Sequence, residues 1–194
     1  MRRILLRTLR RRIWNVARRA SRAALQLCIC LLPCAVACDA QDTSEYALKA
    51  AFLFHFAQLT KFPAEAGSPR AFAFCTVGKD PFGGELERVL SAKTIASRPT
   101  TILHLKDAAN VRNCSVLFVG ADQEKQATAF LAGARDAAVL ITGESTRILH
   151  AGAMIAFERD GERLRFQVNP ANAAKSGISF SSNLLNLASS IVRD

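Results

Sequence analysis

Few residues in this sequence have the type and spacing that chemistry requires. Two cysteines, Cys75 and Cys114, lie beyond residue 40, and neither belongs to a C-x-x-C pair. The three histidines stand singly, without an H-E-x-x-H motif, at His55, His104 and His150. Structural and catalytic metal sites need several such ligands at characteristic spacings. The sequence therefore predicts no metal site.

Nucleotide-binding and nucleophile motifs are also missing. The glycine-rich stretch GKDPFGG (78–84) lacks the G-K-[ST] ending of a phosphate loop, and neither G-x-G-x-x-G nor G-x-S-x-G occurs. Asp80 and Asp122 each follow a strand-ending glycine, where we expect them to cap helices and to repel phosphate. The serine-rich SFSSN (179–183) is typical of helix capping. We therefore expect no cofactor and no enzymatic activity.

Cys75 and Cys114 are best interpreted as a structural pair. Two cysteines in an exported chain most often form one disulfide. Closing a loop of about 40 residues is worth roughly 4 kcal/mol in the chain-entropy model. The alternatives are two separate buried thiols and a redox pair. A redox pair would need exposed thiols of low pKa, whereas both residues lie in apolar, strand-like runs.

Residues 1–40 have the pattern of an export signal. An arginine-rich start precedes an apolar segment, 23–37, which is too short to span a bilayer as a helix. Cleavage is expected after Ala37, which ends an A-x-A sequence, or after Ala40. Lipid anchoring at Cys38 and an uncleaved anchor are the alternatives. The preferred interpretation is a soluble exported protein.

The positive charge of the chain is concentrated at its N-terminus. The formal net charge is +10, but nine of the 26 Lys and Arg residues lie within residues 1–37, which contain no acid. The remainder carries 17 basic against 16 acidic side chains. Nucleic-acid-binding proteins need a broad positive field. The balance therefore predicts no nucleic-acid partner.

The stretch YALKAAFLFHFAQLTKFP (46–63) is apolar on almost every side of a helix. Asp42 and Glu45 have capping-box spacing, and the helix should end near Lys61 because a proline follows. One stripe along it consists of Leu48, Phe52, His55, Leu59 and Phe62. A helix of this kind is expected to be buried on most sides, and it is too often interrupted by polar residues to span a membrane. His55 is then a core histidine with a hydrogen-bonded ring, or alternatively a ligand or partner contact.

Four short apolar runs follow this helix. They are AFAFCTVG (71–78), TTILHL (100–105), CSVLFVG (114–120) and AAVLITG (137–143). Unbroken apolar runs are typical of parallel strands that are covered on both faces. Helical segments beginning near Pro81 and Gln123 separate most of these strands. The pattern predicts α/β architecture with right-handed crossovers.

The end of the chain has a different pattern. MIAFERDGERLRFQV (154–168) alternates on either side of Asp160-Gly161, which predicts an antiparallel hairpin. A short helix from Pro170 and a last helix from Ser181 or Ser182 should follow. The last helix is expected to bury Leu184, Leu185, Ala188, Ile191 and Val192. The prediction is thus one α/β domain over 41–194, with a mostly parallel sheet flanked by helices, a C-terminal antiparallel hairpin and a closing helix.

Several of these segments together resemble the YfiR family of exported bacterial proteins. The resemblance rests on the Phe-rich helix, FCTVGKDPFG, CSVLFVG and the stretch from ITGESTR to NLLNLA, and it covers about Tyr46 to Ala188. It implies a non-catalytic periplasmic regulator that binds the periplasmic segment of an inner-membrane diguanylate cyclase and represses it, which lowers cyclic di-GMP and biofilm formation. It also implies a homodimer, sequestration by an outer-membrane lipoprotein, and a sensor kinase as partner in some relatives. Cys75 and Cys114 match the family's disulfide positions.

The sequence departs from the family pattern at points that bear on its partners. Phe62 stands where a tryptophan is common, and no cysteine follows Cys114 to form a second bridge. We expect a partner surface that includes Phe62, Arg163 and Arg165, although the two arginines could simply line a solvated sheet face. The alternative function is a small-ligand-binding module that serves a sensor histidine kinase or a transporter. An exported enzyme is the third hypothesis.

Overall fold

The computed structural model describes residues 37–63 and 71–193, with side chains from residue 45 onward. The chain divides into two units, Met1–Asp42 and Thr43–Asp194, and the architecture below is that of the second unit. The predicted export signal (1–40) lies outside the described residues apart from the backbone of 37–40. Within the described ranges, no helix has both the length and the hydropathy that a membrane crossing requires.

Short helices and strands alternate along the chain. The first half contains α2 (Ala37–Gln58), β1 (Thr60–Lys61), β2 (Phe72–Val77), α3 (Glu85–Leu90), β3 (Thr94–Ile95), β4 (Arg98–Leu105), η1 (Ala108–Asn113) and β5 (Val116–Val119). The second half contains η2 (Ala121–Gln126), α4 (Ala127–Gly133), β6 (Leu140–Gly143), α5 (Thr146–His150), β7 (Ile155–Asp160), β8 (Arg163–Val168), α6 (Pro170–Lys175), β9 (Ser179–Phe180), α7 (Ser182–Leu187) and β10 (Ser190–Ile191). The predicted strands and the predicted hairpin are all present.

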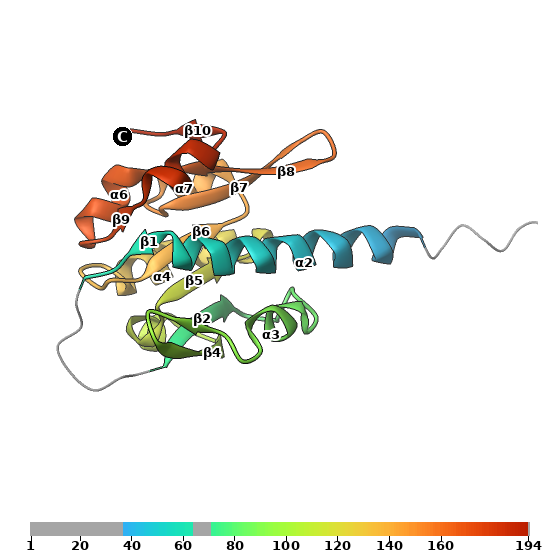
Figure 1. Ribbon diagram of the computed structural model, residues 1–194, viewed down its shortest axis with the longest axis horizontal. Coiled ribbons are helices and arrows are strands. Elements are labelled where there is room, and N and C mark those ends of the chain that lie inside the picture. Colours follow the sequence, from blue (N-terminus) through green and yellow to red (C-terminus); the bar gives the residue numbers. More distant parts are fainter. Residues whose placement is uncertain (1–36, 64–70, 194) are drawn as a thin grey trace, which may run out of the picture. The chain divides into compact units, whose positions relative to one another are not determined.

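The described strands form one large sheet and one small one (Figure 1). The large sheet has the order β10-β8-β7-β6-β5-β2-β4-β3. The five strands from β7 to β4 in this order run parallel, whereas β8 is antiparallel to β7 and β3 is antiparallel to β4. The small sheet pairs β1 with β9. These pairings confirm the predicted fold class of a mostly parallel sheet with a C-terminal antiparallel hairpin.

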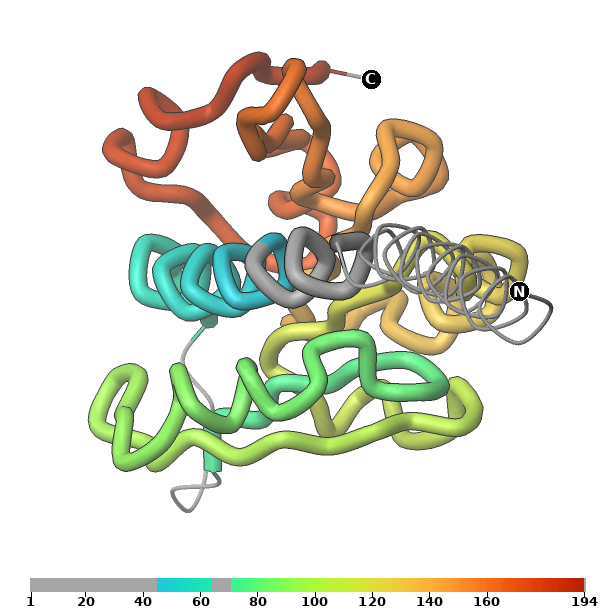
Figure 2. The backbone as a smooth tube through the Cα atoms, turned by 90° about the vertical axis from the view of Figure 1, so that its right-hand side faces the viewer, coloured from blue at the N-terminus to red at the C-terminus, as the bar shows by residue number. Residues whose placement is uncertain are grey.

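The strands β2, β5 and β6 are covered on both faces, as their unbroken apolar runs predict. The same prediction is wrong for β4, where Leu103 and His104 are exposed. One face of the sheet packs against α2, α3 and α7, and the other packs against η1, α4 and α5. Alternate residues of β2 show the division, since Phe72 and Phe74 join the first cluster while Ala73 and Cys75 join the second. Figures 1 and 2 show α2 crossing the middle of the sheet, with α3 on one side and the C-terminal elements on the other.

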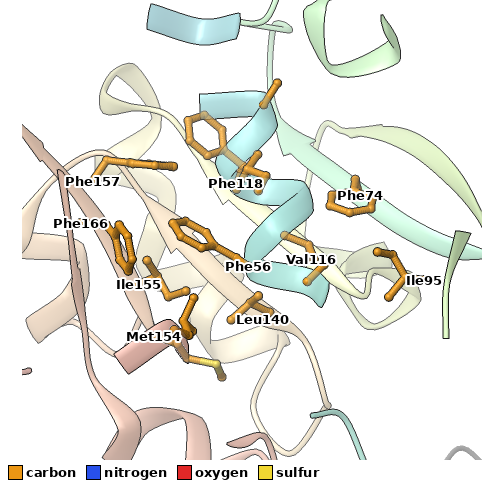
Figure 3. Close-up of a cluster of buried hydrophobic side chains, with 14 of the residues drawn as sticks. Phe56, Phe74, Ile95, Val116, Phe118, Leu140, Met154, Ile155, Phe157 and Phe166 are labelled. Atoms are coloured by element: carbon orange, nitrogen blue, oxygen red, sulfur yellow. The ribbon is translucent and has the colours of Figure 1, made fainter. Parts of the chain in front are cut away.

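Phe56 of α2 lies at the centre of the larger core (Figure 3). Its side chain is 1% exposed. The centroid of its ring lies 4.7 Å from that of Phe166, in the T-shaped geometry that favours aromatic pairs, and 5.6 Å from that of Phe157. The hairpin strands β7 and β8 are therefore packed directly against α2.

The helix α2 buries a different stripe from the predicted one. Its buried residues are Lys49, Ala50, Leu53, Phe56 and Ala57. Leu48 is 46% exposed and His55 is exposed, so the prediction of a core histidine is wrong. Because the helix is apolar almost all round, its sequence does not tell which side meets the sheet.

The bounds of α2 also differ from the prediction. It is already helical at Ala37, where the described residues begin, rather than starting near Asp42, and it ends at Gln58 rather than near Lys61. Thr60 and Lys61 form β1, because they pair with Phe180 and Ser179 of β9. The tertiary pairing with β9 thus replaces the last helical turn.

Two further helix boundaries were predicted wrongly, one because of a strand pairing and the other because of two glycines. The hydroxyl-bearing Ser181 caps α7 as expected by accepting from the Leu184 N–H at 3.3 Å. That helix nevertheless ends at Leu187, because Ser190 and Ile191 pair with the edge of β8 and leave Ile191 40% exposed. At the other boundary, Gly83 and Gly84 adopt positive φ, so α3 begins at Glu85 instead of at Pro81.

Candidate functional site

The carboxyl edge of the sheet holds a cluster of four charged side chains. Lys49 of α2 lies at its centre and bonds the carboxylates of Glu45, at 2.7 Å, and Glu144. The other oxygen of Glu144 accepts the Ala121 N–H at 2.7 Å, and Arg159 of the hairpin pairs with Glu45 at 2.5 Å. The cluster therefore ties α2 to the ends of β5 and β6 and to the hairpin.

Lys49 is the most deeply placed member of this cluster. The residue is 5% exposed, and its Nζ atom lies 4.3 Å from the centroid of the Tyr46 ring. Burial raises the pKa of Glu45, but the hydrogen bonds and charges of Lys49 and Arg159 outweigh it, so the pKa lies below its ordinary value of 4.5. Two carboxylates and two cations leave the cluster without a net charge. The cluster therefore has a structural role, because it holds α2 against the sheet and the hairpin.

The same edge is also where an α/β sheet of this kind would bind a ligand, between β2 and β5. Here Gln123 fills the space, since its side-chain amide would lie 3.0 Å from a Cβ added at Gly78. Asp122 accepts from that amide at 3.0 Å. Neither aspartate caps a helix as predicted, because Asp80 accepts from the Phe82 N–H ahead of α3 and Gly120 precedes η2. The edge therefore presents carboxylates and a filled crevice.

One arrangement on the sheet has the order of groups found in hydrolase triads. The Thr76 hydroxyl lies 2.7 Å from Nδ1 of His104, and Nε2 of His104 lies 3.9 Å from a Glu87 carboxylate oxygen. A nucleophile must be reachable by its substrate, however, and Thr76 is 0% exposed within β2. The group therefore braces β4 against β2. Its members come together through strand register, which the sequence does not display.

The other two histidines lie apart from this group. His55 is exposed on α2, and its Nδ1 atom lies 3.2 Å from the Gln58 amide oxygen. His150 is exposed at the end of α5. Among the described residues, no group of three or more histidine, cysteine or acidic side chains has the geometry to hold a metal ion.

The predicted disulfide is present between Cys75 and Cys114. The bridge joins β2 to the segment that leads into β5, with the Cα atoms 5.9 Å apart and the two cysteines 39 positions apart in the sequence. Both cysteines are buried, at 1% and 5% exposure. Buried sulfurs do not turn over as a catalytic redox pair, so the bridge is structural.

The three residues of the predicted partner surface do not gather in one place. Arg163 and Arg165 are exposed near the turn of the hairpin, beyond the carboxyl edge of the sheet, and Arg165 pairs with Asp160 at 3.0 Å. Phe62 is half-buried at the opposite edge, where its ring packs against Phe72 at the start of β2.

Leu48 is an exposed apolar residue of α2. It follows Glu45 by three positions, so the two share a side of α2, and Glu45 bonds the hairpin residue Arg159. Sequence reasoning missed Lys49, Glu144 and Leu48. The Glu45–Lys49 spacing of four residues was the one available signal for this cluster.

Comparison with known proteins gives a distant structural likeness and one family. No curated protein matches the sequence. A conserved domain protein from Vibrio cholerae has a TM-score of 0.48 and 12% identity, covering 62% of this chain and 54% of its own. An ABC domain from Streptococcus pneumoniae, solved in complex with L-Trp, has a TM-score of 0.45 and 9% identity, covering 62% and 55%. The chain thus spans about half the length of these two structures. The model of the YfiR/HmsC-like family matches residues 46–189, and the chain belongs to that family.

Proposed function

We propose that this protein is an exported, periplasmic regulator that represses an inner-membrane diguanylate cyclase by binding its periplasmic segment. Membership of the YfiR/HmsC-like family over residues 46–189 is the observation that carries this proposal. The carboxyl edge of the sheet agrees with it, because the four charged side chains around Lys49 pair with one another and the crevice is filled by Gln123. Regulation through contact needs no catalytic group.

The contact surface that we propose combines the exposed side of α2 with the hairpin. Leu48 offers apolar area at 46% exposure on α2, and Arg163 and Arg165, exposed on the hairpin, offer positive charge. Interfaces commonly combine an apolar centre with a charged rim. This surface fits a partner segment that has apolar and acidic residues. Phe62 is excluded from it by its position at the opposite edge of the sheet.

Deletion of the gene tests the function directly. Cyclic di-GMP, measured by mass spectrometry in a host that retains the cyclase, should rise on deletion and return to the starting level when the wild-type gene is supplied. An unchanged level would contradict repression. If the level is unchanged while phosphorylation of a neighbouring sensor kinase changes, the kinase is the partner instead.

Variants of the complementing gene test the surface. Leu48→Glu and Arg163→Glu should fail to restore low cyclic di-GMP, because each opposes the charge or polarity that the contact requires. Leu103→Glu and Lys106→Glu are matched controls, since these exposed residues lie on or just after β4, on the far side of the sheet from the hairpin. All four variants should accumulate equally by immunoblot. Restoration by Leu48→Glu and Arg163→Glu alike would remove this surface from the proposal.

A further inference from the structure

The second face of the sheet carries an open groove between α4 and α5. Two hollows make it up, with volumes of about 290 Å³ and about 260 Å³, and they adjoin because Thr128 and Ala151 line both. The first hollow continues toward α6. Neither hollow includes a residue of the cluster around Lys49.

Small residues keep the groove open, and apolar ones form its floor. Ala151 and Gly152 end α5 opposite Leu131 of α4. A Cβ added at Gly152 would come no closer than 3.9 Å to the Leu131 side chain, so space remains between the two elements. Leu131, Ile141 and Met154 supply an apolar lining in the larger hollow. Its volume lies just below the range of roughly 300–1,000 Å³ that is typical of small-molecule sites.

Positive charge collects at one end of this groove. Arg135 and Lys175 both line the larger hollow, together with Asp136. Neither cation forms an ion pair with a carboxylate in the described part of the chain. Lys175 donates at 3.0 Å to the side-chain amide oxygen of Asn172. Asn172 is 8% exposed, and its amide nitrogen donates to two main-chain carbonyl oxygens. Lys175 is therefore held in place by a neutral partner.

At the opposite end of the groove, the charged side chains are paired with each other. Glu124 and Arg147 line the smaller hollow and pair with each other at 2.8 Å. Beside Arg135, in contrast, a further guanidinium approaches, because Arg112 donates to the main-chain oxygen of Arg135 at 2.9 Å. Residues 38–194 carry 17 basic and 16 acidic side chains, so their overall charge is nearly balanced. The end of the groove beside Arg135 nevertheless has a local excess of positive charge.

We propose that the groove is a binding site for a small organic carboxylate with an apolar body. The carboxylate would lie between Arg135 and Lys175, and the body would cover Leu131, Ile141 and Met154. Guanidinium and ammonium groups bind carboxylates through charge-assisted hydrogen bonds, which are the stronger class. The proposal is independent of cyclase repression, because binding is a property of the protein alone.

Binding of 1-naphthoate to the purified mature chain tests the site, with equilibrium dialysis as the assay. Its uncharged and cationic counterparts, 1-naphthalenemethanol and 1-naphthylmethylamine, should bind at least about tenfold more weakly, as should inorganic phosphate. Added salt should weaken binding of the carboxylate. Equal binding of the charged and uncharged naphthalene compounds would overturn the proposal.

Variants locate the binding on the protein. Arg135→Glu and Lys175→Glu should each reduce the affinity for 1-naphthoate about tenfold, and Ala151→Trp should abolish binding by filling the groove. Lys106→Glu is the matched charge-reversal control and should bind normally. All of these residues are exposed, so the variants should melt as the wild type does. Unchanged affinity in Arg135→Glu and Lys175→Glu, or displacement of 1-naphthoate only by acidic peptides, would contradict the assignment.

Discussion

Replacement of Lys49 by methionine should destabilise the protein strongly. Methionine keeps the apolar stem of the side chain but removes the charge that two carboxylates share. Glu45 retains Arg159, whereas the side chain of Glu144, 7% exposed, is left with only the Ala121 N–H. Breaking a buried pair by removing one partner costs about 3–5 kcal/mol. For a body of this size the melting temperature should fall by roughly 6–20 °C.

The assay is chemical unfolding of the wild type, Lys49→Met, Glu144→Gln and the double variant. Because the cost arises from a buried charge left unpaired, the double variant should be more stable than Lys49→Met alone. The interaction energy from this cycle should be about 2 kcal/mol. Glu85 and Arg88 provide the matched control, since their pair at 2.6 Å is exposed on the arginine side and should couple by about 0.5 kcal/mol or less.

Either of two outcomes would contradict the expected coupling between Lys49 and Glu144. If Lys49→Met were as stable as the wild type within about 0.5 kcal/mol, the attraction within the cluster would only offset the cost of burying its charges. A double variant as unstable as the sum of the two single variants would show that Lys49 and Glu144 act independently.

Three further predictions follow from the disulfide, a close packing contact and a lowered pKa. Cys75→Ser paired with Cys114→Ser should lower the free energy of unfolding by about 4 kcal/mol, given their sequence separation of 39, and urea titration of the oxidised and variant proteins measures the difference. Gly143→Ala should cost about 1–3 kcal/mol, because the added Cβ overlaps the Ile148 side chain, and Gly143→Ala with Ile148→Ala should lose the steric part of that cost. The lowered pKa of Glu45 gives stability that is present above about pH 4.5 and is lost as the pH falls through the folded-state pKa, so Glu45→Gln should melt with a weaker dependence on acid pH than the wild type does.

The sequence predicts the sheet well because its information is local. Unbroken apolar runs identified β2, β5 and β6 as buried parallel strands and β4 as a parallel strand, although most of β4 is partly or fully exposed, and alternation about Asp160-Gly161 identified the hairpin. The disulfide could also be predicted, because only two cysteines lie beyond the N-terminal region.

The orientation of α2 could not be predicted, because a helix that is apolar all round has no preferred face. The buried Lys49 could not be predicted either. Its partner Glu144 is 95 residues away, and a lysine between apolar residues is expected to face solvent. Likewise, the proximity of Thr76 to His104 depends on how two strands align. The groove follows from the spacing of α4 and α5, which only the packed structure defines.

The position of α2 constrains the order in which this protein can fold. Phe56 is made early, yet the rings that surround it, Phe157 and Phe166, lie about a hundred residues further along the chain. At roughly 5–20 residues per second, synthesis alone separates these partners by about 5–20 s. During that interval the nascent helix exposes a row of phenylalanines that would bind a chaperone or aggregate. Any fragment that stops before β8 should therefore remain unfolded.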